Sequence, residues 1–382
     1  MEQSVKDILA DDFWIMPATP EYIDKGVPYI TSKNIKNGTI DFSKVNYISQ
    51  EDYEYISKNR PILVGDILIS MIGTLGETAE VKETDGLFYG QNMFLVRIDE
   101  SKVNKRYFLN FFKSNCVKRA LKGKQNQSTQ KYLKANHIED LIIPVPDVTK
   151  QELIAKQLDK LTYIITLRTN ELKQLDDLIK ARFVEMFGDP VSNSYGFPEA
   201  TLPELGELGR GVSKHRPRND SKLLGGDYPL IQTGDVANAG LYITSYGGTY
   251  SELGLKQSKM WNKGTLCITI AANIAKTAIL EFDACFPDSV VGFIANEKTN
   301  NIFIHYWFSF FQAILESQAP ESAQKNINLK ILSELKVIVP KKEKQDEFVE
   351  FIEQVYKSKV AVQKALDETQ ILFDSLMQKY FG

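Results

Sequence analysis

The chain has 382 residues, which exceeds the usual size of one domain and favours two domains with connecting segments. Its 43% apolar and 25% charged residues are typical of globular proteins, and its net charge of −3 excludes a uniformly basic nucleic-acid-binding surface. The N-terminal residues lack the basic and apolar regions of a signal peptide, and no apolar run reaches the roughly 18 residues of a membrane span, so we expect a cytoplasmic protein.

The first half of the chain starts with a predicted sheet and ends with a long predicted helix. Short β-branched runs interrupted by Gly and Asn over residues 27–98 predict strands and turns. The segment after Pro146 contains neither Pro nor Gly before Gly188, and a capping-box pattern opens it. A helix over residues 149–187 would be about 58 Å long at ~1.5 Å per residue.

Apolar side chains along this helix alternate at spacings of four and three residues, which is the pattern of a coiled-coil seam. The seam is formed by Ile154, Leu158, Leu161, Ile165, Leu172 and Ile179. A C-terminal helix carries a second seam, formed by Phe348, Ile352, Val355, Leu366, Phe373 and Leu376. Polar residues interrupt the two seams at different places: Arg168, Arg182, Lys359 and Thr369. Such mismatched interruptions favour pairing of two unlike helices within one chain, because they help fix the register.

The second half of the chain repeats the first. Residues 130–188 align without a gap with residues 324–382, at an offset of 194. The identities include Gln151 with Gln345, and both segments end in Phe-Gly. The preceding regions repeat more loosely, since PYITSKNIKNG in the first half resembles PLIQTGDVANAG in the second. The order along the chain is therefore domain, helix, domain, helix.

These patterns predict an α+β protein with two similar globular domains, each a twisted β-sheet with helices, separated by two long helices. Because each helix leaves its own domain, side-by-side packing makes the helices an antiparallel coiled coil with approximate two-fold symmetry. The alternative is a plain helical hairpin with only a structural role. The predicted segments are a first domain 1–148, a central helix 149–189, a second domain 190–342 and a C-terminal helix 343–382.

The first domain has fewer residues before its repeated strand-and-turn motif than the second domain has. About 27 residues precede Pro28, whereas about 39 separate Pro190 from Pro229. The first domain therefore either lacks an N-terminal extension or is completed by the C-terminal helix.

The proline-containing strands IIPVP and VIVP are each followed by Lys-Gln and an acidic residue, and then by a heptad helix ending in Phe-Gly. This arrangement is similar to the specificity subunits of Type I restriction-modification enzymes. The resemblance covers the whole chain and is strongest at residues 139–190 and 333–382. It implies that the globular domains are target-recognition domains, each reading one half of a split, asymmetric DNA sequence. It also implies that the helices set the gap between the halves.

The resemblance further implies which partners and cofactors to expect. The helices would dock two modification subunits, which carry S-adenosylmethionine and methylate adenine at N6. Restriction subunits that use ATP and Mg²⁺ would join them, translocate DNA and cut it, in defence against foreign DNA. The chain itself would bind double-stranded DNA, hold no cofactor or metal, have no activity alone and need no membrane.

Two basic, amide-rich stretches could contact DNA, since Lys and Arg neutralise phosphates and Asn and Gln can bond base edges. Residues 118–134 carry six basic and no acidic side chains, and residues 210–222 carry five basic side chains and one acid. The candidates in the first domain are Lys122, Lys124, Gln125, Asn126, Gln127, Thr129 and Lys131. Those in the second are Lys214, His215, Arg216, Arg218, Lys222, Lys325 and Asn326. A solvated loop remains the alternative for either stretch taken alone.

The sequence lacks the motifs of a catalytic subunit. It contains neither the Asn/Asp-Pro-Pro-aromatic loop of an amino-methyltransferase nor a G-x4-G-K-[ST] phosphate loop. Asp66 followed by Glu80-Val81-Lys82 imitates a magnesium-dependent nuclease, but this spacing is common in any acidic chain. The three scattered cysteines lack zinc-site spacing. We expect His137 and His305 to be structural, whereas His215 lies in a basic stretch.

Two other functions stay open at this point. The duplicated domains could form an interaction scaffold that binds proteins or small molecules; salt-dependent binding to duplex DNA, in complex with a methyltransferase, would exclude it. The chain could also serve a related system whose partner fuses methylation and cleavage, which the neighbouring genes would reveal.

Overall fold

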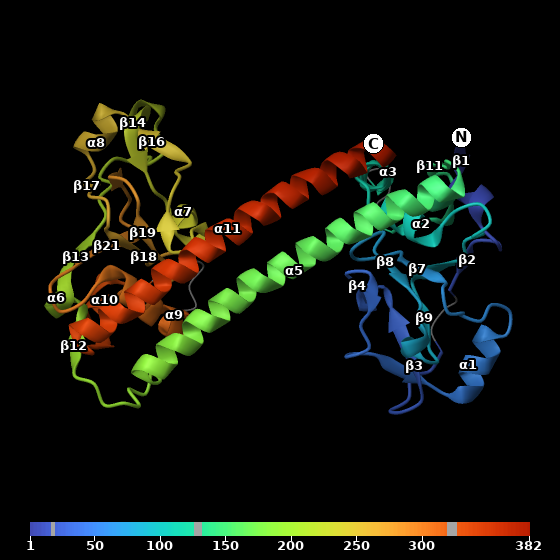
Figure 1. The fold of residues 1–382 in the computed structure, drawn as a ribbon, viewed down its shortest axis with the longest axis horizontal. Helices are drawn as coiled ribbons and strands as arrows, with labels where there is room; N and C mark the ends of the chain where they lie inside the picture. Colours follow the sequence, from blue (N-terminus) through green and yellow to red (C-terminus); the bar gives the residue numbers. More distant parts are fainter. Residues whose placement is uncertain (17–19, 126–131, 319–326) are drawn as a thin grey trace. The chain divides into compact units, whose positions relative to one another are not determined.

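The structure is a computed structural model that describes residues 1–16, 20–125, 132–318 and 327–382 (Figure 1). It forms two compact units: unit 1 combines Met1–Thr169 with Gln363–Gly382, and unit 2 is Asn170–Val362. Both units contain part of the two long helices, α5 (Val148–Phe187) and α11 (Lys342–Phe381). None of the described helices is long and apolar enough to cross a membrane.

Unit 1 is built on two small sheets. The antiparallel sheet contains, in order, β2 (Trp14–Ile15), β10 (Met93–Val96), β7 (Ile67–Ser70) and β8 (Thr78–Glu80). The mixed sheet contains β6 (Asn46–Ile48), β3 (Val27–Thr31) and β9 (Tyr89–Gln91). Two strand pairs complete it: β1 (Glu2–Ser4) with β11 (Ile142–Pro144), and β4 (Ile35–Lys36) with β5 (Thr39–Ile40). Its helices are α1 (Gln50–Ser57), α2 (Lys105–Phe112), α3 (Asn115–Gln125) and α4 (Ala135–Glu139).

Unit 2 repeats this plan with an additional strand in each of its two sheets. Its first sheet contains β13 (Gly206–Arg210), β21 (Val290–Ala295), β18 (Leu266–Thr269), β19 (Thr277–Leu280) and β15 (Tyr242–Ile243). Its second contains β16 (Gly248–Tyr250), β14 (Leu224–Leu230), β20 (Ala284–Cys285) and β17 (Met260–Trp261). β12 (Glu199–Thr201) pairs with β22 (Lys336–Ile338). Its helices are α6 (Leu202–Leu205), α7 (Thr233–Asn238), α8 (Glu252–Lys256), α9 (Asn301–Gln318) and α10 (Leu329–Glu334). The predicted α+β class with two similar domains is confirmed.

The central strand of each unit separates two apolar cores. In β7, Ile67 and Ile69 pack with the helices, while Leu68 between them packs with the mixed sheet, because successive side chains of a strand point to opposite faces. The matching strand β18 divides its residues in the same way, with Leu266 on the helical side and Cys267 on the other. Burial on both faces explains why these strands read as continuous apolar runs.

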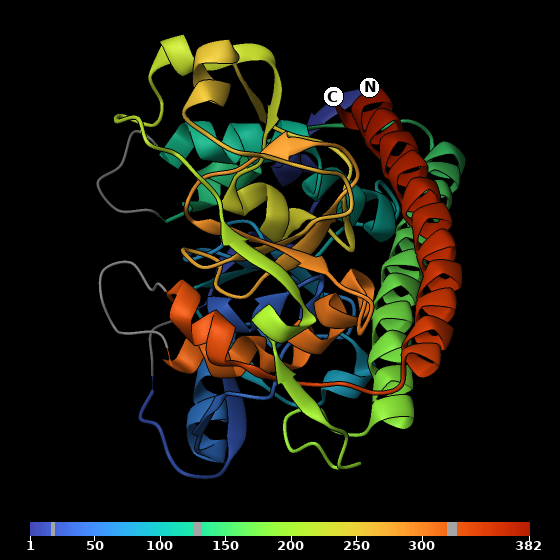
Figure 2. The ribbon, with the colours of Figure 1, turned by 90° about the vertical axis from the view of Figure 1, so that its left-hand side faces the viewer.

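The end of each long helix completes a domain core. In unit 1 the ring of Phe381, the penultimate residue, lies 5.0 Å from Tyr107 and 5.9 Å from Phe111 of α2. In unit 2 the ring of Phe187 lies 5.1 Å from Phe303 of α9. Both chain termini therefore belong to unit 1, where Figures 1 and 2 show them close together. Of the two explanations for the short start of the first domain, the structure supports completion by the C-terminal helix.

In unit 1, α5 and α11 pair with opposite directions. The Tyr380 hydroxyl donates a hydrogen bond to Gln157 Oε1 over 3.1 Å. Eleven residues further along α5, Arg168 donates to Thr369 Oγ1 and to the carbonyl of Ala365, which lie earlier in α11. The polar interruptions Arg168 and Thr369 therefore bond to each other inside the helix pair.

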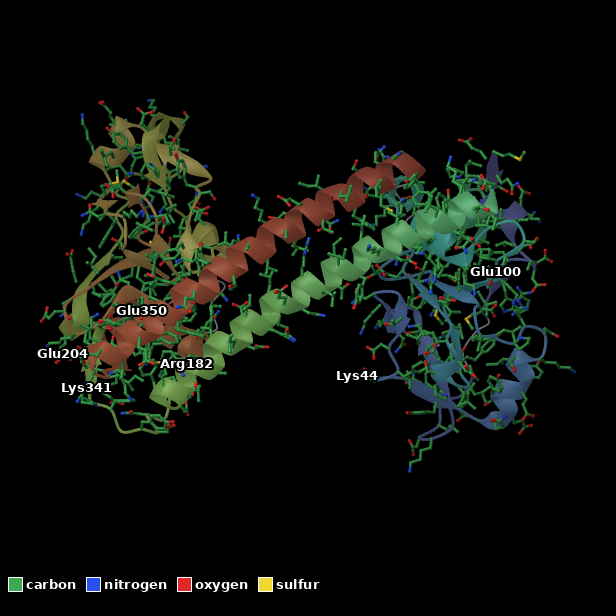
Figure 3. All side chains as sticks on the ribbon, in the orientation of Figure 1. Lys44, Glu100, Arg182, Glu204, Lys341 and Glu350 are labelled. Atoms are coloured by element: carbon green, nitrogen blue, oxygen red, sulfur yellow. The ribbon has the colours of Figure 1, made fainter. Side chains whose placement is uncertain are left out.

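The same antiparallel pairing occurs in unit 2. Asp176 forms an ion pair with Lys359. Arg182, which lies further along α5 (Figure 3), donates to Glu347 over 3.1 Å. Across both units, none of the twelve predicted seam residues is exposed. The buried ones are Ile154, Leu158, Ile179, Phe348, Ile352 and Val355, and the half-buried ones are Leu161, Ile165, Leu172, Leu366, Phe373 and Leu376.

A fully buried glutamine near the start of each long helix joins that helix to its domain. Gln151 Oε1 accepts from the backbone N–H of Asn104 over 2.8 Å, and its Nε2 donates to the carbonyls of Lys102 and Pro146 over 3.1 and 2.8 Å. Both N–H donors of this amide and one of the two lone pairs of its oxygen are therefore used in hydrogen bonds.

Gln345 makes the equivalent contacts in unit 2. Its Oε1 accepts from Thr299 Oγ1 over 2.9 Å, and its Nε2 donates to the carbonyls of Lys298 and Pro340 over 3.0 and 2.9 Å. The identity found at these two positions in the sequence therefore marks a repeated connection between domain and helix.

We predict that Gln151→Met destabilises unit 1 although it preserves the side-chain volume. The substitution leaves the Asn104 N–H and two carbonyl groups without their partner, and each buried polar group left unpaired costs about 1–3 kcal/mol. The free energy of unfolding, measured by urea denaturation, should fall by about 2 kcal/mol or more. The control is Gln174→Met, at an exposed position of the same helix. Equal unfolding curves for the two variants would show that Gln151 contributes no stability.

Candidate nucleic-acid interface

The turn between β7 and β8 in unit 1 has an unusual, hydrogen-bonded conformation. Ser70 Oγ donates to the carbonyl of Thr74 over 2.5 Å and accepts from the backbone N–H of Glu77 over 2.9 Å. Gly73 and Gly76 adopt positive φ angles of 77° and 76°. Glycine suits both positions, because it has no Cβ to clash in the left-handed region.

The matching turn of unit 2, between β18 and β19, keeps this conformation without glycine. Thr269 Oγ1 accepts from the backbone N–H of Lys276 over 3.0 Å and also bonds to the carbonyl of Asn273. Ala272 and Ala275 have φ angles of 63° and 57°, a region that costs an L-residue roughly 1–2 kcal/mol. Both copies keep the left-handed conformation although it strains the alanines of the second, which points to a positional requirement at this turn.

These turns hold the chain beside the predicted DNA-contacting segments. The N–H of Leu133 donates to the carbonyl of Met71 over 2.9 Å, and the N–H of Ile327 donates to the carbonyl of Ile270 over 2.9 Å. Sequence analysis did not find the turns, although extending the loose repeat past β7 and β18 would have matched Ser70 with Thr269.

Only part of the predicted site of the first domain lies within the described residues. Lys122 is exposed on α3, and Lys124 and Gln125 belong to the last turn of that helix. The remaining candidates, Asn126, Gln127, Thr129 and Lys131, lie outside the described residues, as do Lys325 and Asn326 of the second domain.

The basic stretch of the second domain forms a surface loop between β13 and β14. Its five candidates, Lys214, His215, Arg216, Arg218 and Lys222, are all exposed. The loop is fixed to the residue after α8, because the backbone N–H of His215 donates to Gln257 Oε1 over 3.0 Å. The structure therefore brings these five residues together on one anchored loop.

Acidic residues neutralise part of this loop. Arg218 forms an ion pair with Asp288, and Arg216 lies 3.5 Å from the same carboxylate. Hydrogen bonds from the backbone N–H of Lys222 and from the His215 ring lower the pKa of Asp220. Within the described ranges, Lys214 and Lys222 have no ion-pair partner, so they are the cations most available to a ligand.

A cavity occurs at the same place in each domain, between the turn described above and the helix that is rich in aromatic residues, which is α2 in unit 1 and α9 in unit 2. The cavity of unit 1 measures about 330 Å³ and that of unit 2 about 280 Å³. Gly76 and Thr78 line the first, and the matching Ala275 and Thr277 line the second. The polar linings differ: the first contains Glu77, Lys113 and Lys118, and the second contains Lys276, His305, Ser309, Gln312, Asp176 and Lys359.

The nuclease-like residues have structural partners. Asp66 is almost completely buried and accepts two hydrogen bonds from Arg97, over 2.7 and 2.9 Å, while Glu80 pairs with Lys105 over 3.2 Å. Among the described residues, no group of three or more His, Cys, Asp or Glu side chains could hold a metal ion. Asp66 therefore stabilises unit 1 through Arg97.

Two of the three histidines have local structural contacts. His137 Nδ1 accepts from the backbone N–H of Lys134 over 3.3 Å at the start of α4. His305 lies in the cavity of unit 2 with its Nδ1 2.9 Å from Thr277 Oγ1. His215, in contrast, is exposed on the basic loop.

One scaffold built twice, with different polar side chains around equivalent cavities and turns, defines a duplicated recognition protein. The family model of the Type I restriction modification DNA specificity domain matches residues 15–177 and 199–369, which together are most of the chain. The chain belongs to this family, and the resemblance seen in the sequence is confirmed.

Similar proteins agree with this assignment. The EcoBI type I restriction enzyme specificity subunit of Escherichia coli is 23% identical over 93% of this chain and 79% of its own length. A protein of Methanocaldococcus jannaschii, provisionally assigned as the MjaX specificity subunit, is 24% identical over 84% of this chain and 78% of its own length. Both relatives are named specificity subunits, in agreement with the expectation of a chain that is not the catalytic subunit.

Two solved structures share the fold over the whole chain. The S subunit of a Type I restriction-modification system from M. genitalium has a TM-score of 0.61 at 13% identity, and covers 100% of this chain and 96% of its own. A chain from a study of complex assembly and conformational transition in the type I R-M system has a TM-score of 0.58 at 17% identity, with coverages of 100% and 97%.

We predict that His305 makes stability depend on pH. Burial lowers its pKa from 6.5 to about 4. Between these values the unfolded chain binds a proton that the folded chain does not, so stability is complete above pH 6.5 and falls as the pH drops toward 4, by about 3 kcal/mol at most. Urea unfolding of His305→Gln at a series of pH values should show a flatter profile. An unchanged profile for His305→Gln would contradict the prediction.

Proposed function

We propose that this chain is the sequence-specific DNA-recognition subunit of a Type I restriction-modification complex. Each domain reads one half of a split, asymmetric target in double-stranded DNA. The observation that carries this proposal is the duplicated turn and cavity: the turn keeps its backbone while Glu77 in one copy becomes Lys276 in the other, and the remaining polar side chains of the cavities differ. A protein that reads two different half-sites needs a common scaffold and different side chains on it.

The helix pair is proposed to set the distance between the half-sites. A helical spacer needs a fixed register, and side-chain contacts across the pair supply one in each unit. In unit 1, Arg168 can bond to Thr369 only in one alignment of α5 and α11. In unit 2, the ion pair of Arg182 with Glu347 restricts the alignment of the two helices in the same way. Cross-helix contacts of this kind support a spacer of defined length.

The helix pair is also proposed to dock two modification subunits, which restriction subunits join. Exposed apolar side chains on the helices of unit 1 support this: Tyr163 is 63% exposed and Ile371 70% exposed, and Leu167 lies one turn after Tyr163. S-adenosylmethionine, ATP and Mg²⁺ would then bind to the partner subunits, and this chain would contribute no catalytic group.

Long-read methylation sequencing tests the proposed function. Cells would express the methyltransferase of the same system with or without this chain. We expect N6-methyladenine in both halves of a split motif only when this chain is present. If a soluble complex of the two proteins forms and no new methylation appears, the proposal is wrong and the interaction scaffold becomes the better explanation.

A second prediction concerns the spacer. Seven residues that continue the seam pattern would be inserted after Thr169 in α5 and after Val362 in α11. One heptad adds about 10.5 Å of helix, which corresponds to about three base pairs at ~3.4 Å each. The methylated motif should keep both half-sites and gain about three unread positions. Changed half-sites with the original gap would show that the helices do not set the spacing.

A further inference from the structure

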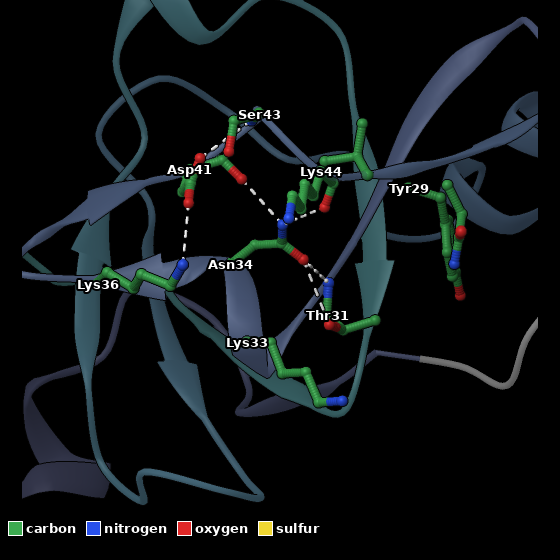
Figure 4. A pocket seen from close by; sticks show the side chains of 10 residues that line it. Tyr29, Thr31, Lys33, Asn34, Lys36, Asp41, Ser43 and Lys44 are labelled. Carbon is green, nitrogen blue, oxygen red and sulfur yellow. Dashed lines mark hydrogen bonds and ion pairs between the residues drawn. The ribbon is translucent and has the colours of Figure 1, made fainter. Parts of the chain in front are cut away.

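A polar pocket in the first domain lies outside all the predicted DNA-contacting residues. It measures about 530 Å³ and is formed by the segment that runs from β3 through β4 and β5 to β6 (Figure 4). Its lining contains three lysines, Lys33, Lys36 and Lys44, and one carboxylate, Asp41. The pocket therefore carries an excess of positive charge in a chain whose net charge is negative.

The single carboxylate neutralises only one of the lysines. Asp41 forms an ion pair with Lys36 over 2.9 Å, and hydrogen bonds from Ser43, together with Lys36, lower its pKa, so it stays ionised. Lys33 and Lys44 are exposed, and neither has an ion-pair partner within the described parts of the chain. Two cations thus remain available to an anionic ligand.

A buried asparagine fixes the backbone that carries these lysines. Asn34 is only 7% exposed, and its Nδ2 donates to the carbonyls of Asp41 and Lys44 over 2.8 and 3.0 Å. Its Oδ1 accepts from the backbone N–H of Thr31 over 2.9 Å. Figure 4 shows Asn34 at the centre of the pocket with these bonds directed to three sides. The positions of Lys33 and Lys44 are therefore held before any ligand arrives.

The second domain contains the cap of this segment without its lysine. The segment matching residues 31–34 forms the same capping arrangement, with Asp235 Oδ2 accepting from the N–H of Gln232 over 2.7 Å. Gly234 and Ala237 stand where the first domain has Lys33 and Lys36. Beyond the cap the backbones differ, because the second domain continues as α7 where the first has β4 and β5. The cap itself forms without a lysine at the position of Lys33, so this lysine is not needed to fold it.

The pocket adjoins the duplicated cavity of the first domain. Asn37 and Gly38, which follow Lys36 directly, line that cavity together with two lysines, Lys113 and Lys118, and one carboxylate, Glu77. Positive charge thus extends from the pocket to α3, which leads into the predicted reading segment. A row of lysines with few carboxylates is better matched to a polymer with regularly spaced negative charges than to one small anion.

We propose that Lys33 and Lys44 bind backbone phosphates of duplex DNA, so that the pocket segment is a phosphate-contacting surface specific to the first domain. This inference rests on the proposed function and adds a contact region to it. Lysine is a flexible point charge, and contacts of this kind position a protein on DNA without reading its sequence. Half-site selection therefore belongs to other residues.

The test is the salt dependence of DNA binding by the full chain in complex with its methyltransferase. Each lost phosphate contact lowers the slope of log K against log salt by about 0.9. Lys33→Ala/Lys44→Ala should lower the slope by about 2 and weaken binding to all duplexes alike, while the methylated motif stays the same. The matched control, Lys6→Ala/Lys58→Ala, removes two exposed lysines from other elements and should keep the wild-type slope.

Two outcomes would overturn the inference and leave the proposed function intact. The first is a wild-type complex that binds DNA with strong salt dependence and a Lys33/Lys44 variant with the same slope. The second is a variant with an altered methylated half-site, since that would mean that these lysines read bases. Failure of the wild-type complex to bind duplex DNA would instead contradict the proposed function itself. Equal melting temperatures for wild type and both variants would establish that folding is unaffected.

Discussion

The architecture depends on how each long helix is joined to its domain, and one buried amide makes that connection in each unit. Gln151 and Gln345 each bond to the segment before the aromatic helix of the domain (α2 or α9) and to the carbonyl of a proline two residues after the preceding strand, Pro146 or Pro340. A buried amide satisfied by fixed backbone groups tolerates little rotation, because any movement leaves polar atoms unpaired. The direction in which each helix leaves its domain is therefore determined at its first turn. Aromatic packing of Phe381 and Phe187 secures the opposite ends.

With the scaffold fixed in this way, the surfaces around it can change. The turn after β7 uses Gly73 and Gly76, while its counterpart uses Ala272 and Ala275 in the same left-handed conformation. Hydrogen bonds from Ser70 or Thr269 hold the turn in both cases, so the backbone does not depend on glycine. Side chains that line the neighbouring cavities bear no such constraint. The side chains of the two domains can therefore differ around the cavities, where a ligand could contact them. A protein with two unlike targets requires this property.

The sequence predicted the features that depend on local periodicity. Heptad spacing and the gap-free repeat were sufficient for both long helices, since neither requires knowledge of tertiary contacts. The pocket around Asn34 could not be predicted in this way, because it forms only when β3, β4 and β5 fold around one side chain. The pairing of Arg216 and Arg218 with Asp288 escaped detection for a similar reason: seventy residues separate Arg218 from that carboxylate. Charge counted along a sequence does not reveal which cations are already neutralised.

That distinction reconciles the net negative charge of the chain with the DNA-binding surface proposed for it. In the second domain, DNA that approaches Arg216 and Arg218 must compete with Asp288, which offsets part of the electrostatic gain. In the first domain, Lys33 and Lys44 need not be released from any described carboxylate. If DNA binds as proposed, the first domain attracts it through lysines without a described carboxylate partner, and the second combines two such lysines, Lys214 and Lys222, with the arginines that exchange one anion for another. An exchange of this kind adds little affinity for a phosphate at an arbitrary position and more for one that fits the site closely. It therefore favours selectivity of DNA binding over affinity.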